Sequence, residues 1–204
     1  RRLSSAASDV YKRQPSQGCI QENAKLLARY AKIVQKNNMV PIVEPEVLMD
    51  GSHSIEECYD ATSRTLKSLF QNLEEENVDI TGTILKPNMV TPGSECQEKI
   101  GVETVAKQTL RCLHECVPVN LPAITFLSGG QSETVSTEHL DAMNKIGGSP
   151  WKLSFSYGRA LQAGALKAWL GKSENVDAAQ SAFSHRALMN KKAALGQWSK
   201  DLEV

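Results

Sequence analysis

The chain has 204 residues and a mass of 22.3 kDa, enough for one domain with a sizeable hydrophobic core. Its 23 basic and 23 acidic side chains give a formal net charge of +0, which disfavours nucleic acid or a charged membrane surface as a partner. The apolar runs are far shorter than the roughly 20 residues of a membrane-spanning helix, so we expect no membrane insertion. Five scattered cysteines are typical of free thiols in a reducing compartment, which predicts a cytoplasmic protein.

Residues 1–14 differ in character from the rest of the chain. They show no sustained hydrophobic period, do not begin with Met, and combine Arg and Ser with a single acid. This composition resembles a transit peptide, but we interpret the segment as a disordered leader that is not native to the protein. The folded domain is then expected to occupy residues 15–204.

The domain opens with an amphipathic helix and a strand. Apolar side chains recur at helical spacing over residues 22–37, which predicts a helix with one apolar and one charged face. Residues 40–46 follow directly, and Pro41 and Pro45 hold the residues before them away from helical geometry. We therefore predict that this second segment is a strand and its exit.

A second helix and strand follow the same pattern. Ser54 and Glu57 form a capping-box pair at the start of an amphipathic segment, which predicts a long helix over residues 54–76. The short apolar run 81–86 is then stopped by Pro87 and a turn-rich stretch, as expected for another strand.

The remaining chain continues the alternation of strands and helices. We predict strands over residues 123–128 and 152–157, and helices over 103–116, after Ser132, over 159–170 and over 174–195. Strand ends recur every 30 to 40 residues or so, near the length of a βα unit. Four such units with nearly continuous apolar strands indicate an α/β protein with a parallel sheet covered by helices.

Each predicted strand ends in a polar side chain next to Pro or Gly, namely at Glu46, Lys86, Ser128 and Tyr157. The carboxyl ends of parallel strands meet at one edge of a sheet, and loops replace the packed core there. The sequence therefore predicts a functional site at this edge.

Lys86 is the candidate nucleophile of that site. It shares one face of its strand with Gly82 and Ile84, so it should point inward, where a buried ammonium either finds a partner or loses its proton. A neutral amine attacks carbonyl carbon, and the resulting iminium is an electron sink for cleavage of a carbon–carbon bond. Position alone favours the simpler alternative, in which Lys86 reaches solvent at the end of the strand.

Glu44 and Glu46 lie two residues apart on an extended segment, so both carboxylates should face the same side. Neighbouring carboxylates separate each other's pKa values, and such a pair can divide into a general acid or base and a charge partner. The alternative is a solvated pair at a strand exit, which is about as compatible with the spacing.

Two glycine-containing loops follow the last two predicted strands and are candidate phosphate sites. Bare backbone N–H groups can cradle an anion, and an arginine beside a helix start can bind it bidentately. A glycine pair alone is commonly a turn, but two consecutive loops of this kind match the usual phosphate site of a barrel. The candidate residues are Ser128, Gly129 and Gly130 in the first loop and Ser156, Gly158 and Arg159 in the second.

The predicted helix 103–116 carries cysteine and histidine side chains, which are potential metal ligands by type. Cys112 and Cys116 are four residues apart with His114 between them, and this spacing does not bring all three side chains together on a helix. We interpret them as packing residues and expect no metal ligands in this chain.

Four motifs, in this order, strongly resemble class I fructose-bisphosphate aldolases of the animal and plant type. The motifs are VPIVEPE, GTILKPNMVTPG, FLSGGQSE and FSYGRALQAGALKAW, and the resemblance covers residues from about 15 to about 195. It implies a TIM (β/α)8 barrel, of which this chain supplies the last four βα units and the C-terminal helices.

The resemblance also implies roles for individual residues. Lys86 becomes the Schiff-base lysine, Glu44 the acid–base residue and Glu46 its supporting carboxylate. The phosphate-binding positions that it implies are Ser128, Gly129, Ser156, Gly158 and Arg159.

The resemblance implies reversible cleavage of fructose 1,6-bisphosphate to dihydroxyacetone phosphate and glyceraldehyde 3-phosphate in glycolysis and gluconeogenesis, without metal or cofactor, by a homotetramer. The family's first four strands, with an aspartate and further lysines of the site, and its C-terminal tyrosine are not in these 204 residues. Four βα units leave sheet edges unpaired, so we expect the chain alone to be inactive. Two alternatives stay open: a non-catalytic binding scaffold for cytoskeletal or proton-pump partners, and another Schiff-base lyase on a barrel.

Overall fold

The computed structural model of the chain describes residues 14–203. The leader predicted over residues 1–14 therefore lies outside the described residues, apart from Gln14. The five cysteines lie in the described part and none of them forms a disulfide, as their scatter along the sequence predicted. No helix of this part combines the length and apolar character that crossing a membrane requires.

Four parallel strands form one sheet in chain order. The strands are β1 (Ile42–Val43), β2 (Ile84–Leu85), β3 (Ala123–Phe126) and β4 (Lys152–Phe155). This arrangement confirms the α/β class and the parallel sheet. All four strands are shorter than the sequence predicted.

The shortening of β1 and β2 has a local cause. Asp79 caps a 3-10 turn, η1 (Ile80–Gly82), whose last two residues had been assigned to the strand 81–86. Pro45 has no N–H to donate to a neighbouring strand, so pairing along the predicted strand 40–46 stops before it. The outer hydrogen bonds of this pair run from Ile84 N to the Pro41 carbonyl, 3.0 Å, and from Lys86 N to the Val43 carbonyl, 2.8 Å.

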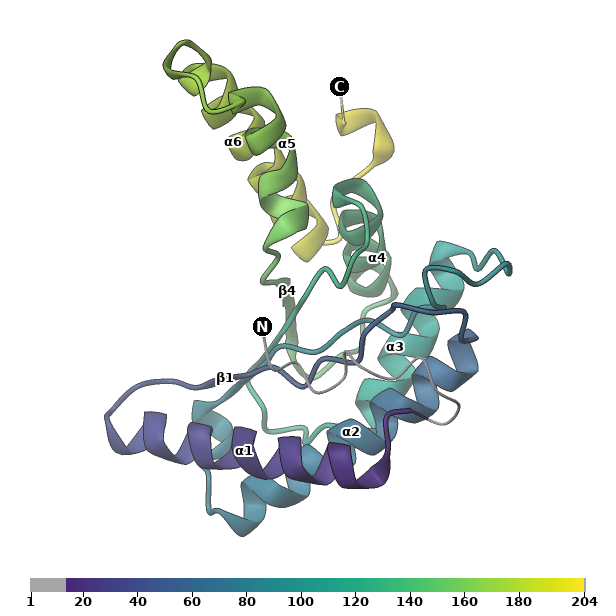
Figure 1. Cartoon of the computed structure of the whole chain (residues 1–204), viewed down its shortest axis with the longest axis vertical. Helices are drawn as coiled ribbons and strands as arrows, with labels where there is room; N and C mark the ends of the chain where they lie inside the picture. Colours follow the sequence, from purple (N-terminus) through teal and green to yellow (C-terminus); the bar gives the residue numbers. More distant parts are fainter. Residues whose placement is uncertain (1–13, 204) are drawn as a thin grey trace.

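Helices α1 to α4 follow one another around the outside of the sheet in chain order (Figure 1). They are α1 (Gln17–Lys36), α2 (Ile55–Glu75), α3 (Val102–Cys116) and α4 (Glu133–Ile146). Alternate strand residues pack beneath them, because side chains of a strand point to opposite faces. Val43, Leu85 and Ile124, adjacent in the register, are fully buried, whereas Ile42 on the other face is 43% exposed.

Helix starts follow local capping chemistry. At α2 the predicted capping box is present in full, since the Ser54 hydroxyl accepts from Glu57 N and the Glu57 carboxylate accepts from Ser54 N. Helix α1 begins five residues before the predicted position 22, because Ser16 caps it by accepting from Cys19 N. Ser132 caps α4, as expected.

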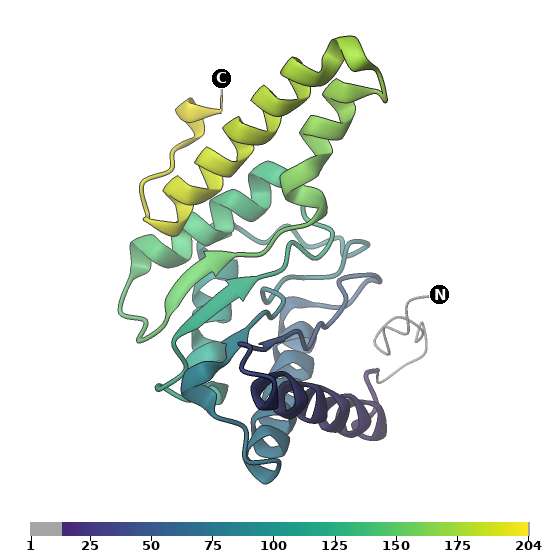
Figure 2. The ribbon, with the colours of Figure 1, turned by 90° about the vertical axis from the view of Figure 1, so that its left-hand side faces the viewer.

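The C-terminal helices form an antiparallel hairpin that stands away from the sheet (Figures 1 and 2). They are α5 (Arg159–Trp169) and α6 (Val176–Ala194), joined through the 3-10 turn η2 (Ser173–Asn175) and followed by η3 (Lys200–Leu202). The predicted helix 174–195 therefore begins as a 3-10 turn. The C-terminal half of α6 packs on α4, which leaves the tip of the hairpin exposed.

Candidate active site

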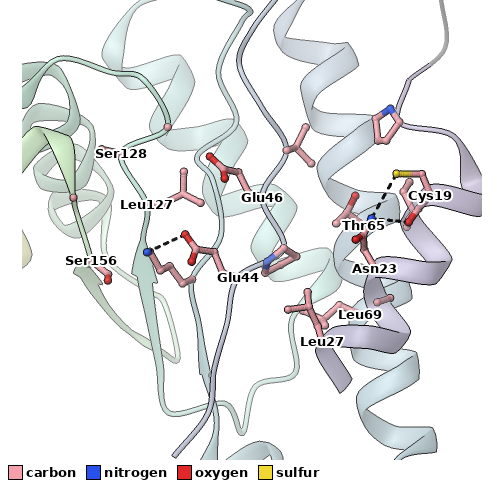
Figure 3. Close-up of a pocket in the computed structure, with 18 of the residues that line it drawn as sticks. Cys19, Asn23, Leu27, Glu44, Glu46, Thr65, Leu69, Leu127, Ser128 and Ser156 are labelled. Atoms are coloured by element: carbon pink, nitrogen blue, oxygen red, sulfur yellow. Dashed lines mark hydrogen bonds and ion pairs between the residues drawn. The ribbon is translucent and has the colours of Figure 1, made fainter. Parts of the chain in front are cut away.

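A cavity of about 850 Å³ lies at the carboxyl ends of the four strands. One wall consists of the segments that follow β1 to β4, and the opposite wall is formed by α1 together with two residues of α2 (Figure 3). Eight of the nine predicted site residues line it: Glu44, Glu46, Lys86, Ser128, Gly129, Ser156, Gly158 and Arg159. Short strands that end together therefore bring side chains from four βα units into one place.

The centre of the cavity holds a lysine–carboxylate pair. Lys86 Nζ lies 2.9 Å from Glu44 Oε1, and the two side chains are 21% and 43% exposed. Glu44 and Lys86 are the first residues after β1 and β2. Lys86 N donates to the carbonyl of Val43, the last residue of β1, and this hydrogen bond holds the two strand ends side by side. A close ammonium–carboxylate contact provides a direct path for a proton between the two groups.

Glu46 lies beside this pair. Its backbone N–H donates to the Glu44 carbonyl at 3.1 Å, and Figure 3 shows both carboxyl groups on the side of the chain that faces Leu127 and Ser128. The tight turn between them keeps two carboxylates within one small volume, which is the arrangement that the sequence spacing predicted.

Asn88 joins the loops that carry these residues. Its amide oxygen accepts from Val47 N at 3.1 Å, and its amide nitrogen donates to Thr62 Oγ1 and to the Met89 carbonyl, both at 3.0 Å. The side chain is 5% exposed, so these bonds form away from competing water. One buried amide thus fixes the exit of β1 against the exit of β2 and against α2.

The loop after β3 presents its backbone to the cavity. Ser128 is buried, and Gly129 and Gly130 have φ values of +50° and +83°, which glycine adopts without the steric penalty of a Cβ. Gly130 is not among the lining residues, because the turn directs it toward Met49, whose Sδ lies 3.0 Å from the position that a Cβ would take.

The side chains behind this loop hold it in place. His139 Nδ1 and Gln131 Oε1 lie 2.6 Å apart. Burial lowers the pKa of His139 to about 4, so the imidazole is neutral near pH 7 and donates to the amide oxygen. His139 therefore supports the loop as a neutral hydrogen-bond donor.

The loop after β4 ends at an uncapped helix start. Gly158 is the N-cap of α5 and, within the described residues, provides no side-chain cap hydrogen bond, while Arg159 is the first helical residue. A helix start with free N–H groups and an adjacent guanidinium favours an anion. Ser156 lines the cavity on the same side, and the structure thus brings the residues of both predicted phosphate loops to one cavity.

Tyr157 does not contribute its hydroxyl to this edge, although the sequence placed it at a strand end. Its Oη donates to the Ser136 carbonyl of α4 at 2.8 Å, and burial raises the pKa of the phenol. The side chain belongs to the sheet face that packs on the helices, and its role is structural.

Several lining residues were not anticipated from the sequence. Gln162 lies three residues after Arg159 on α5, so helical spacing could have indicated it. Asn23 of α1 and Thr65 of α2 reach the cavity only through the packing of two helices, for which the sequence carries no signal. Within residues 14–203 no group of three or more His, Cys, Asp or Glu side chains is arranged to hold a metal ion.

The fold and the site together define an α/β protein of the TIM-barrel type, with a lysine–carboxylate centre at the carboxyl ends of its strands. Comparison with solved structures agrees: a fructose-bisphosphate aldolase from Plasmodium falciparum superposes with a TM-score of 0.89 at 48% identity, over 91% of this chain and 53% of that one.

Comparison of sequences identifies the family. The model of fructose-bisphosphate aldolase class-I matches residues 5–204. Fructose-bisphosphate aldolase 4, cytosolic, of Arabidopsis thaliana is 53% identical over 94% of this chain and 49% of its own length, and fructose-bisphosphate aldolase B of Ovis aries is 54% identical over 90% and 51%. The chain belongs to the class I fructose-bisphosphate aldolase family, and it spans about half the length of these relatives.

Proposed function

We propose that the full-length protein containing this chain cleaves fructose 1,6-bisphosphate reversibly to dihydroxyacetone phosphate and glyceraldehyde 3-phosphate, as a step of glycolysis and gluconeogenesis. The contact of 2.9 Å between Lys86 Nζ and Glu44 Oε1 is the observation that carries the proposal. It supplies a nucleophile and a proton acceptor in a cavity that also contains two anion-binding loops. The names of the relatives support the reaction.

The reaction begins with proton transfer from the Lys86 ammonium to the Glu44 carboxylate. The neutral amine then attacks the ketose carbonyl carbon and forms a carbinolamine, and Glu44 returns the proton as water leaves. The Glu44 carboxylate then takes the proton of the substrate hydroxyl that becomes the aldehyde, the carbon–carbon bond breaks with its electrons drawn into the iminium, and the aldehyde departs. Protonation of the remaining enamine and hydrolysis release the ketone and regenerate Lys86. Glu46 supports the charge changes of Glu44, and the steps require no cofactor.

The two loops bind one phosphate of the substrate. The lining of the cavity includes Ser128, Gly129, Ser156, Gly158 and Arg159, whose backbone N–H groups, hydroxyls and guanidinium are suitable donors to a phosphate. Such donors position the carbonyl against Lys86, and positioning of this kind contributes a large part of catalysis in general.

The chain itself is expected to lack turnover. Four strands leave the outer edges of β1 and β4 without partners in the described sheet, and four βα units more are needed to close an eight-stranded barrel. We propose that the full-length protein is a cytoplasmic homotetramer. The cytosolic designation of the Arabidopsis relative supports the compartment, and the family resemblance alone supports the tetramer.

The proposal is tested by replacing the acid–base residue. Glu44→Gln keeps the size of the side chain but cannot accept the proton, so kcat for cleavage should fall by about 100-fold or more, with a small change in KM. Glu56→Gln on the exposed face of α2 is the matched control and should leave both constants unchanged. A Glu44→Gln enzyme with ordinary kcat would remove Glu44 from the reaction.

A binding function is the second candidate, because the Plasmodium falciparum relative was solved in complex with TRAP. The scaffold alternative would extend to cytoskeletal or proton-pump partners of this protein. It predicts that Glu44→Gln leaves partner binding intact while cleavage is lost, which separates the two functions. Another Schiff-base lyase is less well supported, since both anion-binding loops suit a phosphorylated ketose.

A further inference from the structure

Two cysteines of α3 converge on one residue of α2, outside the lining of the cavity. Cys112 Sγ lies 3.3 Å from Ser63 Oγ, and Cys116 Sγ lies 3.8 Å from the Ser63 carbonyl oxygen. The two thiols also hydrogen-bond to each other. His114, between them in sequence, turns to the ring of Trp151 instead, at 5.1 Å between ring centroids. The cluster is therefore a pair of thiols and not a Cys–His metal site.

The two thiols differ in environment. Cys112 is fully buried and Cys116 is partly exposed. The hydrogen bond from Cys112 and the nearby Lys67 of α2 lower the pKa of Cys116 to about 7, against the opposing effects of burial and of Glu115 on α3. The same hydrogen bond and burial raise the pKa of Cys112. The lowered pKa makes Cys116 the more nucleophilic thiol of the pair, and the raised pKa keeps Cys112 protonated beside it.

We propose that Cys112 and Cys116 form a dithiol site that hydrogen peroxide oxidises to a disulfide within α3. The Cys116 thiolate attacks one peroxide oxygen, the O–O bond breaks, and the other oxygen leaves as hydroxide and takes a proton to become water. Cys116 is then a sulfenic acid. Cys112 sulfur attacks the Cys116 sulfur, the S–O bond breaks, and hydroxide leaves with the Cys112 proton as a second water. Two electrons pass from the two thiols to the peroxide.

The position of the pair at the end of a helix makes the second step possible. Side chains four residues apart on a helix have Cβ atoms about 5–6 Å apart, whereas a disulfide needs about 3.5–4.5 Å. The last turn must therefore close by about 1–2 Å. Cys116 is the final residue of α3, and Val117 is already extended with φ −106° and ψ 129°, so the movement disturbs the helix end alone. The bond is strained, and small thiols should reduce it readily.

The experiment uses the chain with hydrogen peroxide at pH 7, followed by blocking of free thiols and digestion with trypsin. Residues 112–145 form one tryptic peptide that contains both cysteines and no other. We expect this peptide to lose two hydrogens and to regain them with dithiothreitol. Cys19, Cys58 and Cys96 lie on other peptides and serve as internal comparison.

Two variants separate the steps. In Cys112→Ser the reaction should stop at a Cys116 sulfenic acid that dimedone traps, and in Cys116→Ser the thiol of Cys112 should stay reduced. Circular dichroism checks that each variant keeps its helices.

Alkylation of Cys116 by iodoacetamide should be half-maximal near pH 7. The proposal is overturned if peptide 112–145 remains reduced while another cysteine is oxidised, if Cys116 pairs with a cysteine on a different peptide, or if a folded Cys116→Ser chain oxidises at Cys112.

Discussion

The carboxyl ends of the strands and the α5–α6 hairpin differ in how deeply the residues around them are buried. Lys86 and Glu44 follow strands whose neighbouring residues Val43 and Leu85 are fully buried. In the hairpin, by contrast, Leu166 and Leu170 are 58% and 68% exposed. The proposed reacting groups thus stand on the buried core, whereas the hairpin joins the core through its base.

Hydrogen bonds at that base explain how the hairpin is held. Arg186 of α6 donates to Glu203 at 2.8 Å and to Thr137 of α4 at 3.2 Å, and Trp198 Nε1 donates to the same Glu203 oxygen at 2.8 Å. Arg186 and Glu203 are largely buried, so these charge-assisted bonds are protected from water. Arg159 starts α5 just beside this base, and its placement depends on both regions.

Truncating one leucine in each region should give the largest difference in stability between the sheet and the hairpin. Leu85→Ala in the sheet should lower the free energy of unfolding by about 3–5 kcal/mol, because it leaves a cavity in a packed core. Leu166→Ala on the exposed face of α5 should change it by about 0.5 kcal/mol or less. Urea unfolding of the two variants measures both. Equal losses would show that the hairpin is as tightly packed as the sheet.

The next largest effect concerns the residue that connects the two regions. Arg159→Ala should raise KM for fructose 1,6-bisphosphate by about 10- to 100-fold, since a charge-assisted contact to phosphate contributes about 1.5–3 kcal/mol. Lys167→Ala, farther along α5 and outside the cavity, is the control and should leave KM unchanged. Steady-state kinetics of the full-length protein measure KM for both variants. An equal rise in KM for Arg159→Ala and Lys167→Ala would point to loss of helix structure.

The smallest effect is a pH dependence at the base of the hairpin. Burial would raise the pKa of Glu203, but hydrogen bonds from Arg186 and Trp198 outweigh it and lower the pKa below the ordinary value. The stabilisation is therefore present above the unfolded pKa of about 4.3 and is lost as the pH falls through the lower folded value. Unfolding between pH 6 and pH 3 should show a steeper loss in the original protein than in Glu203→Gln. Parallel curves of unfolding free energy against pH for the two proteins would contradict a stabilising role of the Glu203 carboxylate.

Short-range sequence patterns were sufficient to predict the order and the type of the helices and strands. The capping box of Ser54 and Glu57 depends on side chains within one helical turn, and Gly158 directly precedes the start of α5 at Arg159. Strand length could not be predicted in the same way, because it depends on which neighbour supplies each hydrogen bond. The sequence predicted an extended segment over residues 40–46, yet pairing with β2 selects only Ile42–Val43 as strand.

The site was predictable to the extent that it follows from strand ends. Lys86 and Glu44 were located by the rule that polar residues after parallel strands share an edge. Gly130 does not line the cavity, since it lies against Met49 in the turn after Gly129, and its phosphate-binding role stays a prediction. Asn23 enters the cavity from α1 through tertiary packing alone, and such a contribution leaves no pattern in the sequence.

The most direct test of the account is to identify the lysine that forms the covalent intermediate. The full-length protein is incubated with dihydroxyacetone phosphate, reduced with borohydride and digested with trypsin. We predict a single adduct on Lys86, within the peptide of residues 68–99, and none in Lys86→Arg, because a guanidinium stays protonated and cannot attack. An adduct on Lys99, Lys107 or Lys152 instead would contradict the mechanism.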